Sequence, residues 1–129
     1  MKNNQFQQII DALPQKPPMR MVDRLHSDRP ALLIAESCPF VLNGSLTQGG
    51  IVEHVAQAYL ANVMSEESSG IALLAQVNEC VVHHLPKVGE VISTETELVK
   101  SAFNMFQIKG KVYLNSQLIS EVKLTLSIG

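Results

Sequence analysis

The feature that most constrains the fold of this chain is one long apolar stretch, GGIVEHVAQAYLANVM, at positions 49 to 64. Ala, Val, Leu and Ile dominate it and proline is absent, which predicts a helix from about Gly50 to Met64, closed by the polar turn sequence SEESSG. Apolar side chains fall on nearly every side of this helix. Because such a helix must be covered on nearly all sides, the rest of the chain has to wrap around it.

The residues before this helix predict a short helix and two strands. Apolar residues at helical spacing indicate an amphipathic helix over residues 4 to 12, which Pro14 ends. The next residues, LPQKPPMR, form an extended segment, because proline fixes its own φ and biases the preceding residue away from helix. The segments MRMVDRL and ALLIAESCPF are typical of strands, with turn residues between them, and NGSLTQGG is a predicted loop.

The C-terminal half has the alternation of half-buried strands. In VISTETELVK, Ile92 and Thr94 share one face while Glu95 and Glu97 share the other. FNMFQIKGKVYL and LISEVKLTLSI alternate in the same way, and Asn115-Ser116 is the predicted turn between them. The apolar face of the last strand is expected to hold Leu118, Val122, Leu124, Leu126 and Ile128.

This order of elements predicts the α+β class, with an antiparallel sheet wrapped around the long helix. The 129 residues fit one domain, residues 1–129, with a real core. Hydrophobic residues make up 46% and charged residues 17% of the chain, which is more apolar surface than one small fold hides. We therefore expect an oligomer, most simply a dimer.

Composition also argues against several classes of protein. The formal net charge is −2 and the ten Lys and Arg residues are scattered, so the basic footprint of a nucleic-acid-binding protein is missing. The sequence lacks both an apolar run long enough for a membrane span and the pattern of a signal peptide, so we expect a cytoplasmic protein. Cys38 and Cys80 have no metal-binding spacing and are expected to be buried free thiols.

Glu53 is the acid in the first turns of the apolar helix. An ionised carboxyl group in apolar surroundings costs several kcal/mol, so it should take up a proton or find hydrogen-bond donors. Gln57 lies four residues later, on the same face of the helix, where its amide could orient the carboxyl group. The alternative is that Glu53 points out at the edge of the helix or bonds a loop backbone.

Gly49 and Gly50 stand where the loop meets the helix. Without side chains there, a ligand could approach the first N–H groups of the helix, where the helix dipole favours an oxygen that carries negative charge. Such donors suit a thioester carbonyl that becomes enolate-like. A Gly-Gly pair that serves only a tight turn is the alternative.

The histidines are poor candidates for a base beside Glu53. His54 follows Glu53 directly, and neighbours on a helix project about 100° apart. His26 lies near the first turn, and the pair His83-His84 ends a strand. We expect all four to be solvated or bonded to backbone, and their spacing predicts no metal site.

Three segments in the same order carry a family resemblance: LPQKPPMRMVDR, GGIVEHVAQA and HHLPKVGEVI. They make nearly the whole chain similar to the hot-dog-fold 3-hydroxyacyl-(acyl-carrier-protein) dehydratases of fatty acid synthesis. The resemblance implies a hot-dog fold, in which an antiparallel sheet wraps around one long central helix, and a dimer with two sites at its interface. It places the catalytic acid of the family at Glu53 and implies acyl substrates carried by acyl carrier protein. No cofactor and no metal are expected.

The chain departs from that family at the second catalytic residue. The family histidine precedes the helix in a Phe-Pro-Gly-containing segment, whereas here the loop reads CPFVLNGSLTQGG and no histidine lies between His26 and His54. Ungapped counting places Pro39 at this position, and a shortened loop places Asn43 near it. This loop is more similar to those of divergent dehydratase-like proteins from aryl-polyene and flexirubin-type pigment pathways, in which paired hot-dog subunits can combine.

Three functions therefore stay open at this stage. The first is a dehydratase-like protein, with Glu53 as acid, Gln57 orienting it and Gly49-Gly50 as carbonyl donors, which is impaired alone or depends on a partner in a homodimer or heterodimer. The second is a non-catalytic subunit that binds acyl chains or stabilises a complex. The third is an acyl thioesterase, in which the helix carboxylate directs water at the thioester carbonyl and no histidine is required.

Overall fold

A computed structural model of the chain describes residues 3–13, 16, 19–63 and 72–128. The helices are α1 (Asn3–Ala12) and α2 (Gln48–Val63). The strands are β1 (Arg24–His26), β2 (Arg29–Leu33), β3 (Val41–Leu42), β4 (Ser45–Leu46), β5 (Ala72–Val82), β6 (Val91–Ala102), β7 (Met105–Leu114) and β8 (Gln117–Ile128).

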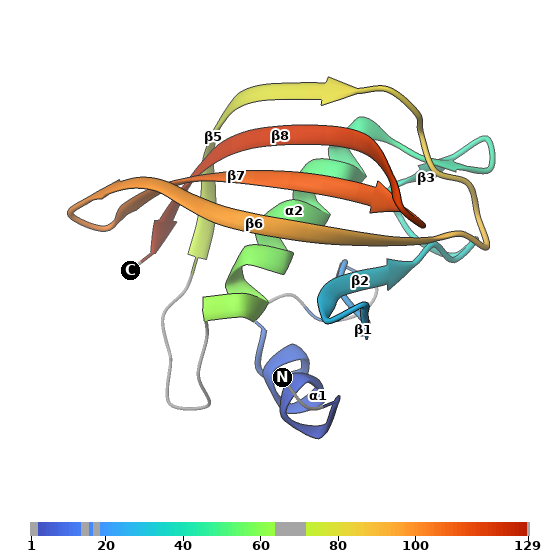
Figure 1. The fold of residues 1–129 in the computed structure, drawn as a ribbon, viewed down its shortest axis with the longest axis horizontal. Helices are drawn as coiled ribbons and strands as arrows, with labels where there is room; N and C mark the ends of the chain where they lie inside the picture. The colour runs from blue at the N-terminus through green and yellow to red at the C-terminus, as the bar shows by residue number, and fades with distance from the viewer. Residues whose placement is uncertain (1–2, 14–15, 17–18, 64–71, 129) are drawn as a thin grey trace.

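Six of the strands form one antiparallel sheet, in the order β1-β2-β6-β7-β8-β5, and β3 and β4 form a separate small hairpin. The sheet curves around α2, while α1 lies near one end of α2 and beside β1 (Figure 1). The predicted architecture, an antiparallel sheet wrapped around one long central helix, is confirmed.

The long helix is covered on nearly all sides, as its composition requires. Eleven of the sixteen residues of α2 are buried, including Ile51 and Val55. The helix lies so close to the sheet that a Cβ atom at Gly110 of β7 would be 2.4 Å from Cγ1 of Val55. Near the end of the helix, Asn62 donates a hydrogen bond to Thr96 Oγ1 of β6 over 3.0 Å. Packing and polar contacts together hold α2 in one register against the sheet.

Short turns join the strands where the sequence predicts them, with one difference. Ser27 and Asp28, between β1 and β2, have φ angles of 53° and 60°, and Asn115, between β7 and β8, has a φ of 57°. The segment predicted as a loop, NGSLTQGG, contains half of a hairpin. Asn43 and Gly44, with φ of 54° and 80°, join β3 to β4 in the way that Asn-Gly favours.

The first predicted strand, MRMVDRL, is largely absent. β1 begins only at Arg24, and the preceding residues 19–23, which we call the strap, lie against α2. Met21 and Val22 are fully buried there. The backbone groups of Met19 and Met21 bond side chains of α2, and only at Asp23 does the strap reach the sheet, through an N–H bond of 2.9 Å to the carbonyl oxygen of Ala31 in β2. The predictions about Pro14 and SEESSG fall outside the described residues.

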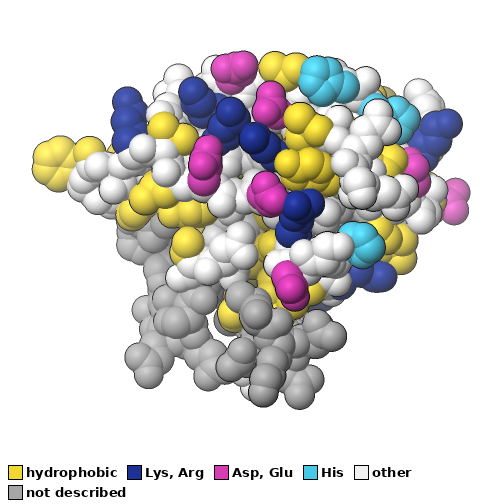
Figure 2. Space-filling model, viewed as in Figure 1, with side chains coloured by type: hydrophobic (Ala, Val, Ile, Leu, Met, Phe, Trp, Pro, Cys, Tyr) yellow, Lys and Arg dark blue, Asp and Glu magenta, His cyan; other side chains and the backbone are white. Residues whose placement is uncertain are grey.

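The face of the sheet that points away from α2 carries charged side chains of both signs, with hydrophobic side chains among them (Figure 2). Glu95 and Glu97 of β6 lie opposite Lys111 and Lys109 of β7 in the strand register. Basic and acidic side chains are interspersed on the face seen in Figure 2. Opposite charges face each other between β6 and β7, which favours the pairing of these two strands.

Candidate functional site

The site begins at Glu53, in the second turn of α2. Its side chain is half-buried, and Oε1 accepts a hydrogen bond of 3.0 Å from Nε2 of Gln57. This is the contact that the spacing of four residues predicts. The side chain of Glu53 is therefore neither fully buried in the core nor fully exposed to water.

Gln57 is fully buried and also holds the strap. Its Oε1 accepts a hydrogen bond of 2.5 Å from the N–H of Met21, and its Nε2 donates to the carbonyl oxygen of Met19 over 3.0 Å. Both N–H groups and the oxygen of the amide thus have partners. The amide links the strap to Glu53 and cannot rotate without breaking several hydrogen bonds.

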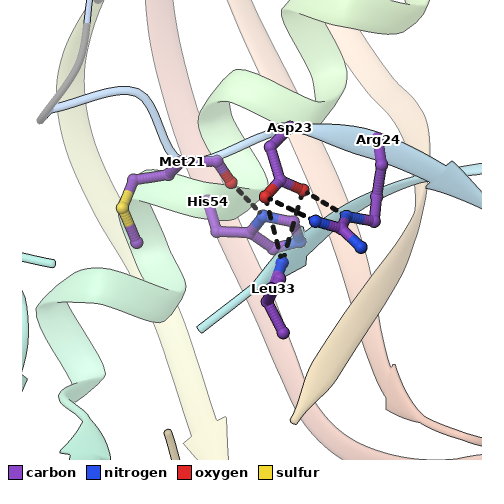
Figure 3. Close-up of polar contacts among 5 residues, drawn as sticks. All are labelled: Met21, Asp23, Arg24, Leu33 and His54. Atoms are coloured by element: carbon purple, nitrogen blue, oxygen red, sulfur yellow. Dashed lines mark hydrogen bonds and ion pairs between the residues drawn. The ribbon is translucent and has the colours of Figure 1, made fainter. Parts of the chain in front are cut away.

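His54 is fully buried and also contacts the strap. Its Nδ1 lies 2.6 Å from the carbonyl oxygen of Met21, and its Nε2 lies 2.8 Å from Oγ1 of Thr94 in β6. Burial lowers the pKa of His54 from 6.5 to about 4, while the bond to Met21 and the negative charge of Asp23 oppose the shift. Figure 3 shows this imidazole facing the Met21 carbonyl, with Asp23 close by.

The prediction that the histidines are solvated or bonded to backbone is confirmed. His54 is bonded to the backbone of the strap, and His26, His83 and His84 are exposed. Sequence reasoning missed the role of His54 as a link between strap and sheet. A signal was present, because a histidine on a helix that is apolar all round must be buried and must therefore find polar partners.

Asp23 ends the strap and ties it to the sheet. Its carboxylate accepts hydrogen bonds from the N–H of Leu33 in β2, over 3.3 Å, and from Nε of Arg24, over 2.9 Å (Figure 3). These contacts fix the point where the strap ends its contact with α2 and the chain continues into β1.

The two glycines at the start of α2 differ in their surroundings. Thr47 caps the helix, since its Oγ1 accepts a hydrogen bond of 3.3 Å from the N–H of Gly50. A Cβ atom at Gly50 would lie 2.6 Å from Cδ1 of Leu46 and 2.7 Å from Cβ of Phe40, so this glycine is needed for packing. Gly49 is exposed, and a Cβ atom there would lie 4.0 Å from Thr47 Oγ1. The N–H of Gly50 thus already has a partner in Thr47, and a role of Gly49 as a donor to a carbonyl oxygen stays a prediction.

The hollows formed by the described residues include two on different parts of the surface. One of about 180 Å³ opens beside the strap, and a second of about 280 Å³ lies among the charged residues of β6 and β7. The first is lined by Arg20, Asp23, Leu32, Leu33, Ala35, Ser37 and Cys38. Glu53 lines neither of these two hollows.

The described residues contain neither a group of metal ligands nor a helix suited to span a membrane. Within residues 3–13, 16, 19–63 and 72–128, no three His, Cys, Asp or Glu side chains converge as metal ligands would. In the same part of the chain, no helix is long and apolar enough to cross a membrane.

Comparison with solved structures places the chain among hot-dog proteins. It aligns with a chain of the dehydratase heterocomplex ApeI:P from Xenorhabdus doucetiae over 94% of its own length and 90% of that chain, with 15% identity and a TM-score of 0.75. A probable thioesterase from Bartonella henselae aligns over 77% of this chain and 86% of its own, with 8% identity and a TM-score of 0.62. A hypothetical thioesterase from Streptococcus pneumoniae with coenzyme A aligns over 77% and 75%, with 15% identity and a TM-score of 0.58.

Comparisons at the level of sequence add nothing to this, because neither a protein-family model nor a curated protein sequence matches the chain. Identities this low establish the fold and leave the reaction open. The chain is a hot-dog-fold protein with a half-buried acid, oriented by a buried glutamine, on its central helix.

Proposed function

We propose that this protein is a dehydratase-like hot-dog subunit that acts on 3-hydroxyacyl thioesters carried by acyl carrier protein. The observation that carries the proposal is the pair Glu53–Gln57, in which a half-buried carboxyl group is oriented by an amide on an otherwise apolar helix. A single oriented acid on such a helix has the chemistry of a proton-transfer group. The resemblance of the helix sequence to that of the dehydratases supports the same role.

The reaction is an elimination of water. A base removes the proton from the carbon next to the thioester carbonyl, the bond between the third carbon and its hydroxyl oxygen breaks, and an acid protonates the leaving hydroxyl group. Glu53 is the acid in this proposal, and the exposed amide of Gly49 at the start of α2 donates to the carbonyl oxygen. The base is an imidazole from a second hot-dog chain, since the four histidines of this chain lie elsewhere.

The edge of the sheet supports a partner chain. β5 has eleven residues, carries one charged residue, Glu79, and pairs on one side with β8. Its side chains Leu73, Leu74 and Val77 are 64%, 40% and 43% exposed. A long apolar edge strand with unpaired backbone groups is a template for pairing with another strand. The similarity to a chain of the dehydratase heterocomplex ApeI:P supports a different hot-dog subunit as the partner, in preference to a second copy of this chain.

Two other functions remain as outcomes of the test. The thioesterases among the solved neighbours favour hydrolysis, for which Glu53 would direct a water molecule at the thioester carbonyl and no histidine is needed. The missing family histidine favours a non-catalytic subunit, which would bind the acyl chain and stabilise a complex.

Incubation with a 3-hydroxyacyl thioester of acyl carrier protein separates these functions. The protein is assayed alone and with a co-expressed hot-dog subunit that carries the family histidine. An enoyl product supports the proposal, a free acid supports hydrolysis, and unchanged substrate in both assays supports the non-catalytic subunit. Glu53→Gln should abolish either activity, while Glu121→Gln, at a half-buried position on β8, should leave it unchanged.

The partner is tested by one further variant. Leu74→Lys places a charge on the exposed edge of β5 and should prevent assembly in sedimentation experiments, together with any activity that depends on the partner. Assembly that survives this change would show that the partner binds elsewhere.

A further inference from the structure

The polar side chains buried at α2 form one continuous chain of hydrogen bonds that ends at Glu53. Thr94 Oγ1 lies 2.8 Å from Nε2 of His54, and Nδ1 of His54 lies 2.6 Å from the carbonyl oxygen of Met21. The N–H of the same residue, Met21, donates to Gln57, whose amide donates to Glu53. His54 and Gln57, two buried polar residues on an apolar helix, therefore both bind the backbone of one strap residue.

The direction of each bond in this chain is forced by chemistry. A carbonyl oxygen only accepts, so Nδ1 of His54 must carry the proton that it shares with Met21, and Nε2 must accept from the hydroxyl group of Thr94. The N–H of Met21 only donates, so the oxygen end of the Gln57 amide must face it. The NH₂ end of Gln57 is then presented to Glu53.

We propose that His54 is a positioning residue for Glu53 and that it acts through the backbone of Met21 and the amide of Gln57. Its effect on turnover rests on the proposed function, whereas its effect on the orientation of Gln57 does not. If the strap shifted, the Gln57 amide would lose the partner that sets its orientation, and Glu53 would lose its donor.

The same bonds hold the strap in place. Apolar residues at the positions of His54 and Gln57 would leave the N–H and the carbonyl oxygen of the buried Met21 without these partners, which is costly for buried polar groups. The polar pair therefore gives the strap a fixed place and the Gln57 amide a unique orientation. Both determine how the carboxyl group of Glu53 is held.

The test compares two replacements of His54 that keep different halves of the imidazole. In His54→Asn the side-chain amide reaches the position of Nδ1, so the bond to the Met21 carbonyl is kept. In His54→Gln it reaches the position of Nε2, so the contact with Thr94 is kept and the bond to Met21 is lost. Ser120→Ala is the matched control, because it removes a buried bond, to the carbonyl of Val81, at a distant part of the sheet.

The main readout is NMR of the full-length protein, which needs no substrate. In His54→Gln, the side-chain amide signals of Gln57 should move toward those of a solvated amide, and hydrogen exchange at the N–H of Met21 should quicken by about tenfold or more. His54→Asn and Ser120→Ala should keep both signatures of the wild type. His54→Leu, which also removes the bond to the Met21 carbonyl, should shift them in the same direction as His54→Gln and serves if that variant does not fold.

The second readout is turnover in the assay of the proposed function. In His54→Gln, kcat should fall by about tenfold with KM nearly unchanged, and His54→Asn should restore it. Altered Gln57 signals in a protein with no turnover in any form would support the positioning role and refute the proposed function. Gln57 signals that stay unchanged in both His54→Gln and His54→Leu, or that change equally in Ser120→Ala, would overturn the inference.

Discussion

Acidification should destabilise this protein through one buried side chain, His54. The imidazole is fully buried between the strap and β6, and burial lowers its pKa from 6.5 to about 4. Asp23, which lies close to the ring, opposes this shift without cancelling it. Between these two pKa values the unfolded chain binds a proton at His54 that the folded chain does not bind.

The sign and the size of the effect follow from this difference. A group whose pKa is lower in the folded protein contributes its full stability above pH 6.5 and loses it as the pH falls toward 4. At about 1.4 kcal/mol for each pH unit, the difference between 6.5 and about 4 amounts to a loss of about 3 kcal/mol, of which about 2 kcal/mol is lost by about pH 5.

Urea unfolding followed by circular dichroism, at about pH 7.5 and about pH 5, measures this loss. The wild type should lose about 2 kcal/mol more than His54→Asn between the two conditions, because asparagine does not titrate. His83→Gln, at an exposed position, should behave as the wild type. Equal pH dependence in the wild type and His54→Asn would refute the argument that a buried neutral imidazole limits stability.

Three further predictions concern backbone positions and are measured by the free energy of unfolding. Gly110→Ala should destabilise the protein by about 1–3 kcal/mol, because the new methyl group would lie 2.4 Å from Val55. Val55→Ala in the same chain should recover part of this loss. If it recovers nothing, the contact with Val55 is not the cause. Gly50→Ala should destabilise the protein, because its Cβ atom would lie too close to Leu46 and Phe40. Gly49→Ala, one residue away in open space, should stabilise the helix by up to about 1 kcal/mol. Effects of the same sign in both variants would contradict the packing argument. Phe103→Gly should stabilise the protein by about 1 kcal/mol, because Phe103 is fully exposed and its backbone has a φ of 57°, which glycine adopts without strain. A loss of stability in this variant would refute the prediction.

Part of the candidate site could be predicted from the sequence because it is local. Glu53 and Gln57 are four residues apart on one helix, so helical geometry alone brings their side chains together. The link through the strap could not be predicted in this way. Gln57 and Met21 are 36 residues apart, and His54 and Thr94 are 40 apart, so their contact depends on how the whole sheet closes around α2.

The last strand shows how a local pattern is modified by its neighbours. The alternation of LISEVKLTLSI places Leu118 on the inner face, together with Val122 and Leu124. In the structure a register shift opposite Val112 and Tyr113 leaves Leu118 half-buried and makes Ile119 fully buried instead. A bulge inserts one residue into the ladder and reverses the faces beyond it, and the sequence carries no clear signal for its position.

The sequence by itself determined the elements whose cause is short-range: an apolar helix that must be enclosed, strands with alternating faces, and turns at residues such as Asn115 that tolerate a positive φ. Only the tertiary structure decided that the predicted strand before Arg24 becomes a strap, that Gly50 serves packing, and that a neutral His54 binds Met21. The physical reason is that a buried polar group takes whichever partner the closed fold brings to it, and that partner can lie anywhere along the chain.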